Sequence, residues 1–146
     1  MKNLVLGLGN LLLADEGVGV HVAQRLLDCE SKDDVVVLDV GNALLDAMPA
    51  IADAGKVILV DAMKGGGTPG TVYRLSIEDC SSAGPIGSVH GFDMKSVLHL
   101  VGREKPPKVT VIGVEPEVIG WSTELSSAVA EALPTVMATI QQELSW

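Results

Sequence analysis

The chain has 146 residues, of which 47% are hydrophobic and only 3% aromatic, so we expect one domain with an aliphatic core. Its formal net charge is −9 at pH 7. This charge argues against nucleic acid and anionic membrane as partners, because there is no basic surface to neutralise phosphates. It is compatible with a basic peptide or a metal cation.

The two cysteines, Cys29 and Cys80, lie far apart and form neither a disulfide framework nor a CxxC metal motif. The apolar run near the start is interrupted by Gly7, Gly9 and Asn10 and lacks a small-residue cleavage site, so no signal peptide is predicted. No stretch reaches the roughly 18 apolar residues that span a bilayer. We therefore expect a soluble cytoplasmic protein. We also expect a monomer, because no helix shows an obvious exposed apolar face.

The first predicted element is a buried strand over residues 4–8, which runs directly into a turn that contains Gly7 and Gly9. Glycines at such a turn allow another backbone, or a ligand, to approach without meeting a Cβ atom. A second apolar run, at 11–13, leads to two acidic residues.

Those acids, Asp15 and Glu16, precede a predicted helix over 17–29. A helix N-terminus offers unpaired N–H groups and the positive end of the helix dipole. Asp15 is suited to cap that helix. Gly17 and Gly19 are poor helix formers, each costing about 1 kcal/mol relative to alanine. We therefore expect another group to come close to the chain here.

Strands and helices alternate along the rest of the chain. The strands are short apolar runs rich in β-branched residues, and the helices have apolar residues three and four positions apart. In order, we predict a strand over 35–40, a helix over about 43–54 that Pro49 bends or restarts, a strand over 56–60, a short edge strand over 71–75, an irregular segment over 76–91, a helix over 92–101, a strand over 108–114, and a helix from Ser122 or Thr123 onward.

This alternation predicts a single α/β domain over residues 1–146. Its three layers are a mostly parallel twisted sheet of about five strands, with helices on both faces. In such sheets ligands bind outside the carboxyl ends of the strands. Asp39 and Asp61 each end a strand and Glu16 follows another, so acidic side chains should gather at that edge.

A dinucleotide site is one interpretation of this edge. Gly7-x-Gly9 follows the first strand, and Asp39 ends the second, as in a dinucleotide-binding fingerprint. However, the third glycine of that fingerprint falls on Leu12, and Asp15 and Glu16 would repel a pyrophosphate. The pattern therefore argues against a bound dinucleotide.

A metal site is the second interpretation. Glu16 and Asp61 supply carboxylates, and His90 supplies an imidazole from the irregular segment. Two oxygens and one nitrogen with open positions suit nickel or zinc better than calcium. A surface role for His90 and a turn role for Asp61 remain open alternatives.

The other candidate residues have simpler expected roles. His21 and His99 lie in predicted helices, and we expect them to be structural or exposed. Asp39 could orient the turn at Gly41 or support a metal ligand from behind.

Nucleophilic catalysis has little support in the sequence. There is no GxSxG turn and no local cysteine signature, and Cys80 is close to His90 only in sequence. Glu16 and Asp61 could share a proton as an aspartic-protease dyad does, although their spacing does not require it.

One motif points further. Residues 7–20 read Gly-x-Gly-Asn-x-Leu-x-x-Asp-Glu-Gly-x-Gly-Val, which resembles the N-terminal signature of the nickel–iron hydrogenase maturation endopeptidases. The resemblance covers nearly the whole chain. It continues at the strand ends Leu38–Gly41 and Val60–Ala62, at Ser88–His90, and at Val111–Pro116.

The resemblance implies an endopeptidase that removes a C-terminal extension from the precursor of a hydrogenase large subunit. It also implies that Glu16, Asp61 and His90 engage nickel that the substrate carries, so the nickel is not a resident cofactor. The family has Asp or Glu at the first of these three positions, where this chain has Glu16. Because Asp15 precedes Glu16 here, the sequence leaves open which of the two reaches the metal.

The resemblance leaves several alternatives open. A catalytically silent relative could act as a nickel-sensing or chaperone-like binding module, since a fold does not guarantee an activity. A peptidase of the same fold could act on another substrate. Nickel could position the peptide, or it could polarise the scissile carbonyl or a water molecule.

Overall fold

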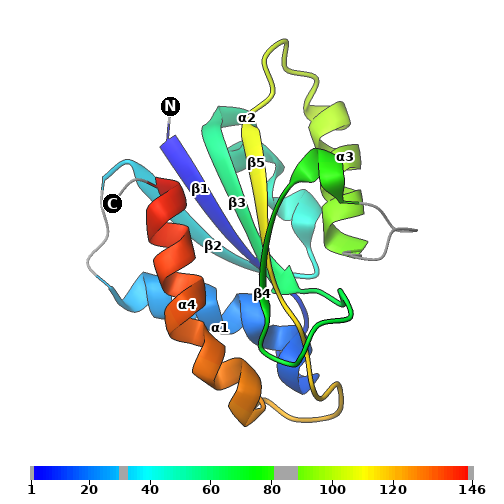
Figure 1. Cartoon of the computed structure of the whole chain (residues 1–146). Helices are drawn as coiled ribbons and strands as arrows, with labels where there is room; N and C mark the ends of the chain where they lie inside the picture. Colours follow the sequence, from blue (N-terminus) through cyan, green and yellow to red (C-terminus); the bar gives the residue numbers. More distant parts are fainter. Residues whose placement is uncertain (1, 30–32, 81–88, 145–146) are drawn as a thin grey trace.

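The computed structural model describes residues 2–29, 33–80 and 89–144, with the backbone only for 89–93 (Figure 1). Five strands form one sheet in the order β2-β1-β3-β5-β4. The strands are β1 (Lys2–Leu8), β2 (Val35–Gly41), β3 (Ala54–Ala62), β4 (Val72–Ser76) and β5 (Lys108–Val114). The α-helices are α1 (Val18–Asp28), α2 (Met48–Asp53), α3 (Val89–Val101) and α4 (Ser127–Leu144), and short 3-10 helices are η1 (Ala14–Gly17), η2 (Leu44–Ala47) and η3 (Ile77–Asp79).

The sheet confirms the predicted architecture. All neighbouring strands are parallel except β4, which pairs antiparallel with β5 at one edge. After β1 the chain forms β2 on one side of β1, and it then crosses to form β3 on the other side of β1. The direction in which strands are added to the sheet therefore reverses between β1 and β3. This switch point is where an open α/β sheet forms a crevice for ligands.

Helices cover both faces of the sheet, as the alternation of elements predicted. Because side chains alternate along a strand, β1 directs Leu4, Leu6 and Leu8 to one face and Val5 to the other. The leucine face packs against η2, α2 and α3, and the Val5 face packs against α1 and α4. Both cores are aliphatic, as the shortage of aromatic residues required.

Several element boundaries differ from the sequence-based expectations: α3 begins at Val89 and not at residue 92, and a 3-10 helix, η3, lies within the segment expected to be irregular. The last helix begins at Ser127, four to five residues later than predicted, because residues 117–126 are held in a loop by hydrogen bonds to Asp15. The predicted helix over about 43–54 is a 3-10 turn followed by α2, with Pro49 in the first turn of α2. Proline restarts the helix there because its missing N–H is not needed in a first turn.

The glycines around α1 bring it unusually close to the sheet. A Cβ on Gly19 would lie 2.1 Å from the carbonyl oxygen of Val60, and one on Gly7 would lie 2.2 Å from the carbonyl oxygen of Gly19. The group expected to approach these glycines is therefore the protein's own backbone. Within the described ranges, no helix is both long enough and apolar enough to cross a membrane.

We predict that Gly19→Ala strongly destabilises the fold. The added methyl would collide with backbone of two strands, which cannot move aside as a flexible side chain can. We expect the free energy of unfolding in urea to fall by at least the roughly 1–3 kcal/mol typical of overpacking. Gly120→Ala is the matched control, because nothing lies within 4 Å of a Cβ at Gly120. Equal stability of the two variants would contradict the proposed close packing.

Candidate catalytic site at the carboxyl edge of the sheet

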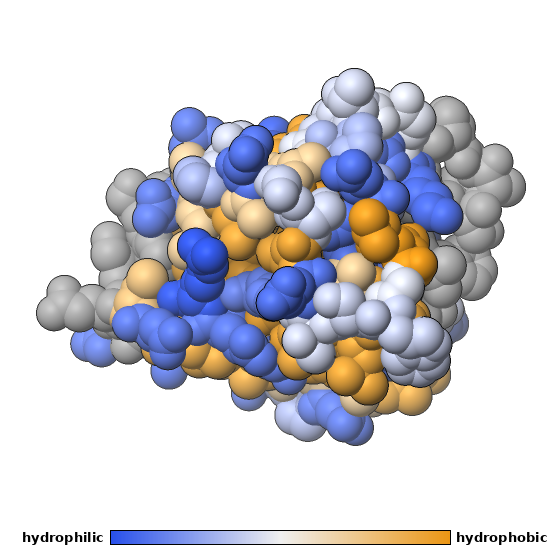
Figure 2. Space-filling model, turned by 90° about the horizontal axis from the view of Figure 1, so that it is seen from below, coloured by the Kyte–Doolittle hydropathy of each residue, from blue (hydrophilic) through white to orange (hydrophobic). Residues whose placement is uncertain are grey.

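The carboxyl ends of β1, β3 and β5 lie at the lower end of the sheet in Figure 1. Figure 2 looks directly at this edge and shows hydrophilic residues beside hydrophobic ones on it. The turn after β1 and the end of β3 meet here, at the switch point of the sheet. This edge therefore holds the candidate site.

Gly9 is the position at which the turn after β1, η1 and β3 meet. Its φ of +117° belongs to a backbone region that favours glycine. A Cβ on Gly9 would lie 1.9 Å from the carbonyl oxygen of Glu16 and 3.5 Å from Oδ1 of Asp61. Only glycine therefore allows the backbone of Glu16 and the carboxylate of Asp61 to approach the same point.

Asp61 is a buried carboxylate at the end of β3, with only 3% of its surface exposed. Its Oδ1 accepts a hydrogen bond of 2.9 Å from the N–H of Ala62. This bond fixes the orientation of the carboxylate relative to the strand. An oriented, nearly buried carboxylate at the switch point is suited to bind a cation or to hold a proton.

Glu16 and Asp15 differ sharply in their surroundings, although they are adjacent in η1. Glu16 is half-buried, whereas Asp15 is completely buried. The Asp15 carboxylate accepts four hydrogen bonds: from the N–H groups of Glu117 (2.9 Å), Val118 (2.8 Å) and Ser126 (2.7 Å), and from the Ser126 hydroxyl (2.8 Å).

The expectation that Asp15 caps the helix following it was wrong. Neither η1 nor α1 has a side-chain cap, and the Asp15 carboxylate binds the loop that precedes α4. Burial raises the pKa of Asp15, but the hydrogen bonds from Val118, Ser126 and Glu117 outweigh burial and hold the pKa below its usual 3.8. Asp15 is therefore an ionised structural residue, which leaves Glu16 as the more accessible of the two acids.

His90 is the second residue of α3. In Figure 1 the chain enters α3 at its lower end and climbs toward β5. The side chain of His90 lies outside the described residues, so its predicted role stays a prediction. Among the side chains that the structure describes, no three His, Cys, Asp or Glu residues are grouped closely enough to hold a metal ion.

Glu115 is a structural residue of this edge that the sequence analysis missed. It follows β5, is only 7% exposed, and its Oε1 accepts hydrogen bonds from Gly65 N–H (2.8 Å), Gly67 N–H (3.0 Å) and the Tyr73 hydroxyl (2.8 Å). Burial raises the pKa of Glu115, but these bonds outweigh it and leave the pKa below the usual 4.5. The sequence contains one signal that could have identified Glu115. It is an acidic residue directly after a buried strand, in a chain that also has a three-glycine loop for it to bind.

The structure also places three other residues from the sequence analysis. Asp39 is exposed and accepts a hydrogen bond of 3.5 Å from Gln24, so within the described residues it does not orient the turn at Gly41. His21 donates a hydrogen bond of 3.1 Å to the carbonyl of Thr123, and His99 is exposed, as expected.

Cys80 is buried, with its Sγ 3.8 Å from the carbonyl oxygen of Ser76. Burial raises the pKa of this thiol, although Lys95 partly opposes the effect. A raised pKa disfavours the thiolate, which is the reactive form of cysteine. The geometry therefore argues against Cys80 as a nucleophile.

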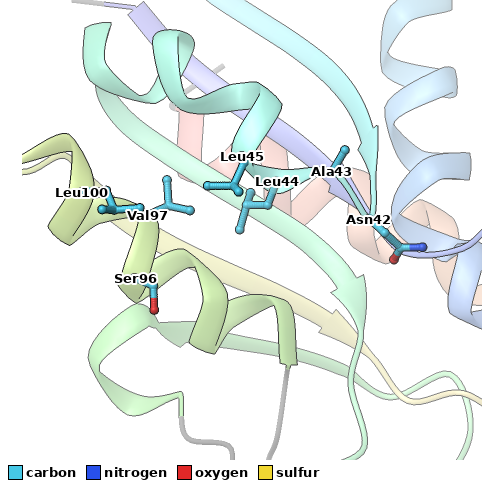
Figure 3. Close-up of a pocket in the computed structure, with 7 residues that line it drawn as sticks. All are labelled: Asn42, Ala43, Leu44, Leu45, Ser96, Val97 and Leu100. Carbon is cyan, nitrogen blue, oxygen red and sulfur yellow. The ribbon is translucent and has the colours of Figure 1, made fainter.

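An apolar pocket of about 430 Å³ lies between η2 and α3 (Figure 3). Leu44 and Leu45 face Val97 and Leu100 across it, and Asn42 lies at the end of the pocket near β2. None of the lining residues is charged, and Ser96 is the one hydroxyl-bearing residue among them. This pocket could accept apolar side chains, whereas the candidate carboxylates Glu16 and Asp61 do not line it.

The fold and this edge define an α/β protein with an acidic site at the switch point of an open, mostly parallel sheet. Residues 20–143 match the family model described as hydrogenase maturation protease. The hydrogenase 2 maturation protease of Escherichia coli K12 is 32% identical, over 97% of this chain and 92% of its own length. The hydrogenase expression/formation protein HupD of Rhodobacter capsulatus is 34% identical, over 97% of this chain and 70% of its own length.

Solved structures agree with the sequence relatives. The hydrogenase maturating endopeptidase HybD from E. coli superposes with a TM-score of 0.80 at 30% identity, covering 98% of this chain and 94% of that one. The HybD maturation protease from Thermococcus kodakarensis also gives 0.80, at 26% identity and full coverage of both chains. The chain belongs to the hydrogenase maturation protease family. It is a peptidase, and this membership favours that role over the dinucleotide and binding-module alternatives.

We predict that Asp15→Asn lowers the free energy of unfolding at neutral pH by about 1–3 kcal/mol, because buried N–H groups lose an ionised acceptor. The pKa of Asp15 is lowered by folding, so its stabilisation is present above the unfolded-state value near 3.8 and disappears as pH falls through the folded value. The difference between wild type and variant should therefore shrink in acid.

Urea unfolding at neutral pH and at about pH 3 measures this difference. Asp53→Asn, at an exposed aspartate of α2, is the control and should match wild type at neutral pH. A deficit of Asp15→Asn that stayed constant down to low pH would show that the carboxylate charge is not what holds the loop.

Proposed function

We propose that this chain is the endopeptidase that removes the C-terminal extension from the nickel-loaded precursor of a nickel–iron hydrogenase large subunit. Family membership supports the peptidase activity, and the names of the relatives support a hydrogenase protein as substrate. The observation that carries the proposal furthest is that the backbone of Glu16 and the carboxylate of Asp61 both lie against one glycine, Gly9, at the switch point.

In this proposal the nickel ion arrives as part of the substrate. Glu16, Asp61 and His90 are the residues that would engage it, and the two carboxylates supply hard oxygen ligands beside the borderline imidazole nitrogen. Asp61 is held in one orientation by the Ala62 N–H, whereas Glu16 is half-buried and reaches solvent. One fixed and one accessible carboxylate suit a site that must accept an ion already bound to another protein.

The reaction itself needs a water molecule activated near the scissile carbonyl. The buried Asp61 carboxylate can accept a proton from such a water, as general bases do. A divalent ion on the substrate would polarise a carbonyl or a water placed beside it. A silent nickel-binding relative would retain the same carboxylates but show no peptide release.

The substrate test compares nickel-loaded and nickel-free precursor from the same organism, incubated in parallel with the chain and read by mass spectrometry. We expect a C-terminal peptide to be released only from the loaded form. Cleavage of both forms would reject nickel as the recognition element. If neither form were cleaved, the chain would not be the processing enzyme for that precursor.

We predict that Asp61→Asn and His90→Ala each reduce precursor cleavage by at least about 10²-fold, the usual contribution of a positioned acid–base group. Glu16→Gln should also lose cleavage, because an uncharged amide is a poorer ligand. Glu131→Gln, at an exposed position of α4, is the control and should cleave normally. Thermal melting of each variant checks that the fold persists, and normal cleavage by Asp61→Asn and His90→Ala would reject the proposed site.

A further inference from the structure

We propose that four exposed apolar side chains beside the candidate site bind an apolar patch on the folded body of the protein substrate. This apolar rim consists of Leu12, Val118, Ile119 and Trp121. The inference rests on the proposed function in one respect, namely that the substrate is a folded protein larger than the peptide that is removed.

The exposure of the apolar rim is large for residues of this kind. Leu12 is 52% exposed, Val118 48%, Ile119 46% and Trp121 85%. Single exposed apolar residues are normal on protein surfaces, but several on adjoining loops mark an interaction site. Tryptophan is also among the residues that contribute most to protein interfaces.

The two loops that carry the apolar rim are joined by their backbones. Ser122 N–H donates to the carbonyl of Leu12 (3.0 Å), and Ala14 N–H donates to the carbonyl of Ser122 (2.8 Å). Asp15 N–H donates to the carbonyl of Val118 (3.1 Å). The 12–15 and 118–122 segments therefore lie side by side, and the exposed side chains of the apolar rim extend from these adjoining backbones.

The junction between these loops is also built at a conformational cost. Ala14 has a φ of +51°, a left-handed conformation that is uncommon for residues other than glycine. The buried carboxylate of Asp15 holds the 117–126 loop with four hydrogen bonds. A surface fixed in this way needs little further ordering when a partner binds, which favours affinity.

The apolar rim is continuous with the candidate site. Leu12 is close to Glu16 in the sequence, and Val118 is hydrogen-bonded to Asp15, the neighbour of Glu16, through both its N–H and its carbonyl. Both loops lie at the edge seen in Figure 2, where hydrophobic residues reach the surface. A protein that placed its C-terminal segment against Glu16 and Asp61 would bring its body onto this surface.

Charge favours such a partner over a second copy of this chain. The exposed acids Glu117 and Glu124 flank the apolar rim, and the whole chain carries a net charge of −9. Two copies joined through this surface would place acid against acid, because a two-fold interface pairs a patch with itself. The structure therefore points to a partner whose apolar patch is bordered by basic residues.

The test measures binding of nickel-free hydrogenase large-subunit precursor, which the proposed function leaves uncleaved, to the wild-type chain and to the double variant Ile119→Ser/Trp121→Ala. We expect the double variant to bind at least about tenfold more weakly, in line with the loss of one interface hot spot. On nickel-loaded precursor it should raise KM with kcat nearly unchanged. Its melting temperature should equal that of wild type, because both side chains are exposed.

Two single variants serve as controls. Leu27→Ser removes an exposed leucine of α1 outside the apolar rim, and Leu45→Ser removes one from the pocket of Figure 3. Both should bind like wild type. Equal binding of the double variant and wild type, weaker binding only for Leu45→Ser, or a change in the chain's own oligomeric state in the double variant would each overturn the inference. Precursor that binds through the apolar rim without being cleaved, even when nickel-loaded, would reject the proposed function alone.

Discussion

The close approach of α1 to the sheet at Gly7 and Gly19 is the constraint on which the arrangement of the site depends. At this distance the helix leaves no room for a side chain between itself and β1 or β3. The turn between β1 and α1 must therefore be compact, and η1 places Glu16 against Gly9 beside Asp61. The glycines that weaken the helix locally thus let the backbone of Glu16 lie at the same edge as the carboxylate of Asp61.

Buried charge has different uses at different places in this fold. Glu143 of α4 accepts hydrogen bonds from Arg74 and Thr110 and lies 3.9 Å from Lys56, so it joins α4 to strands β3, β4 and β5. Burial raises the pKa of Glu143, but Arg74 outweighs it and keeps the residue ionised. Glu143 has basic partners on the sheet, whereas Asp15 is held by uncharged N–H and O–H groups.

The sequence predicted the parallel sheet, its edge strand and the strand-end acids, because these follow from local apolar patterns and from the rule that carboxyl ends meet at one edge. It did not predict the partners of Asp15 or Glu115, since these lie more than forty residues away in the chain. In the sequence, a carboxylate near a helix start is expected to cap that helix. Only the folded chain shows that Asp15 binds the loop before α4. The same loop delays the start of α4 to Ser127.

The hydrogen bonds of Asp15 join residues 102 to 111 positions apart. Contacts of such long range form only after most of the chain is available. During synthesis, the turn that carries Glu16 therefore emerges long before the loop that fixes its neighbour. A growing chain would hold both candidate carboxylates yet lack the contacts that fix Asp15, the neighbour of Glu16, until the segment before α4 has been made. The order of synthesis thus leaves this edge of the sheet unassembled until the loop before α4 has been made.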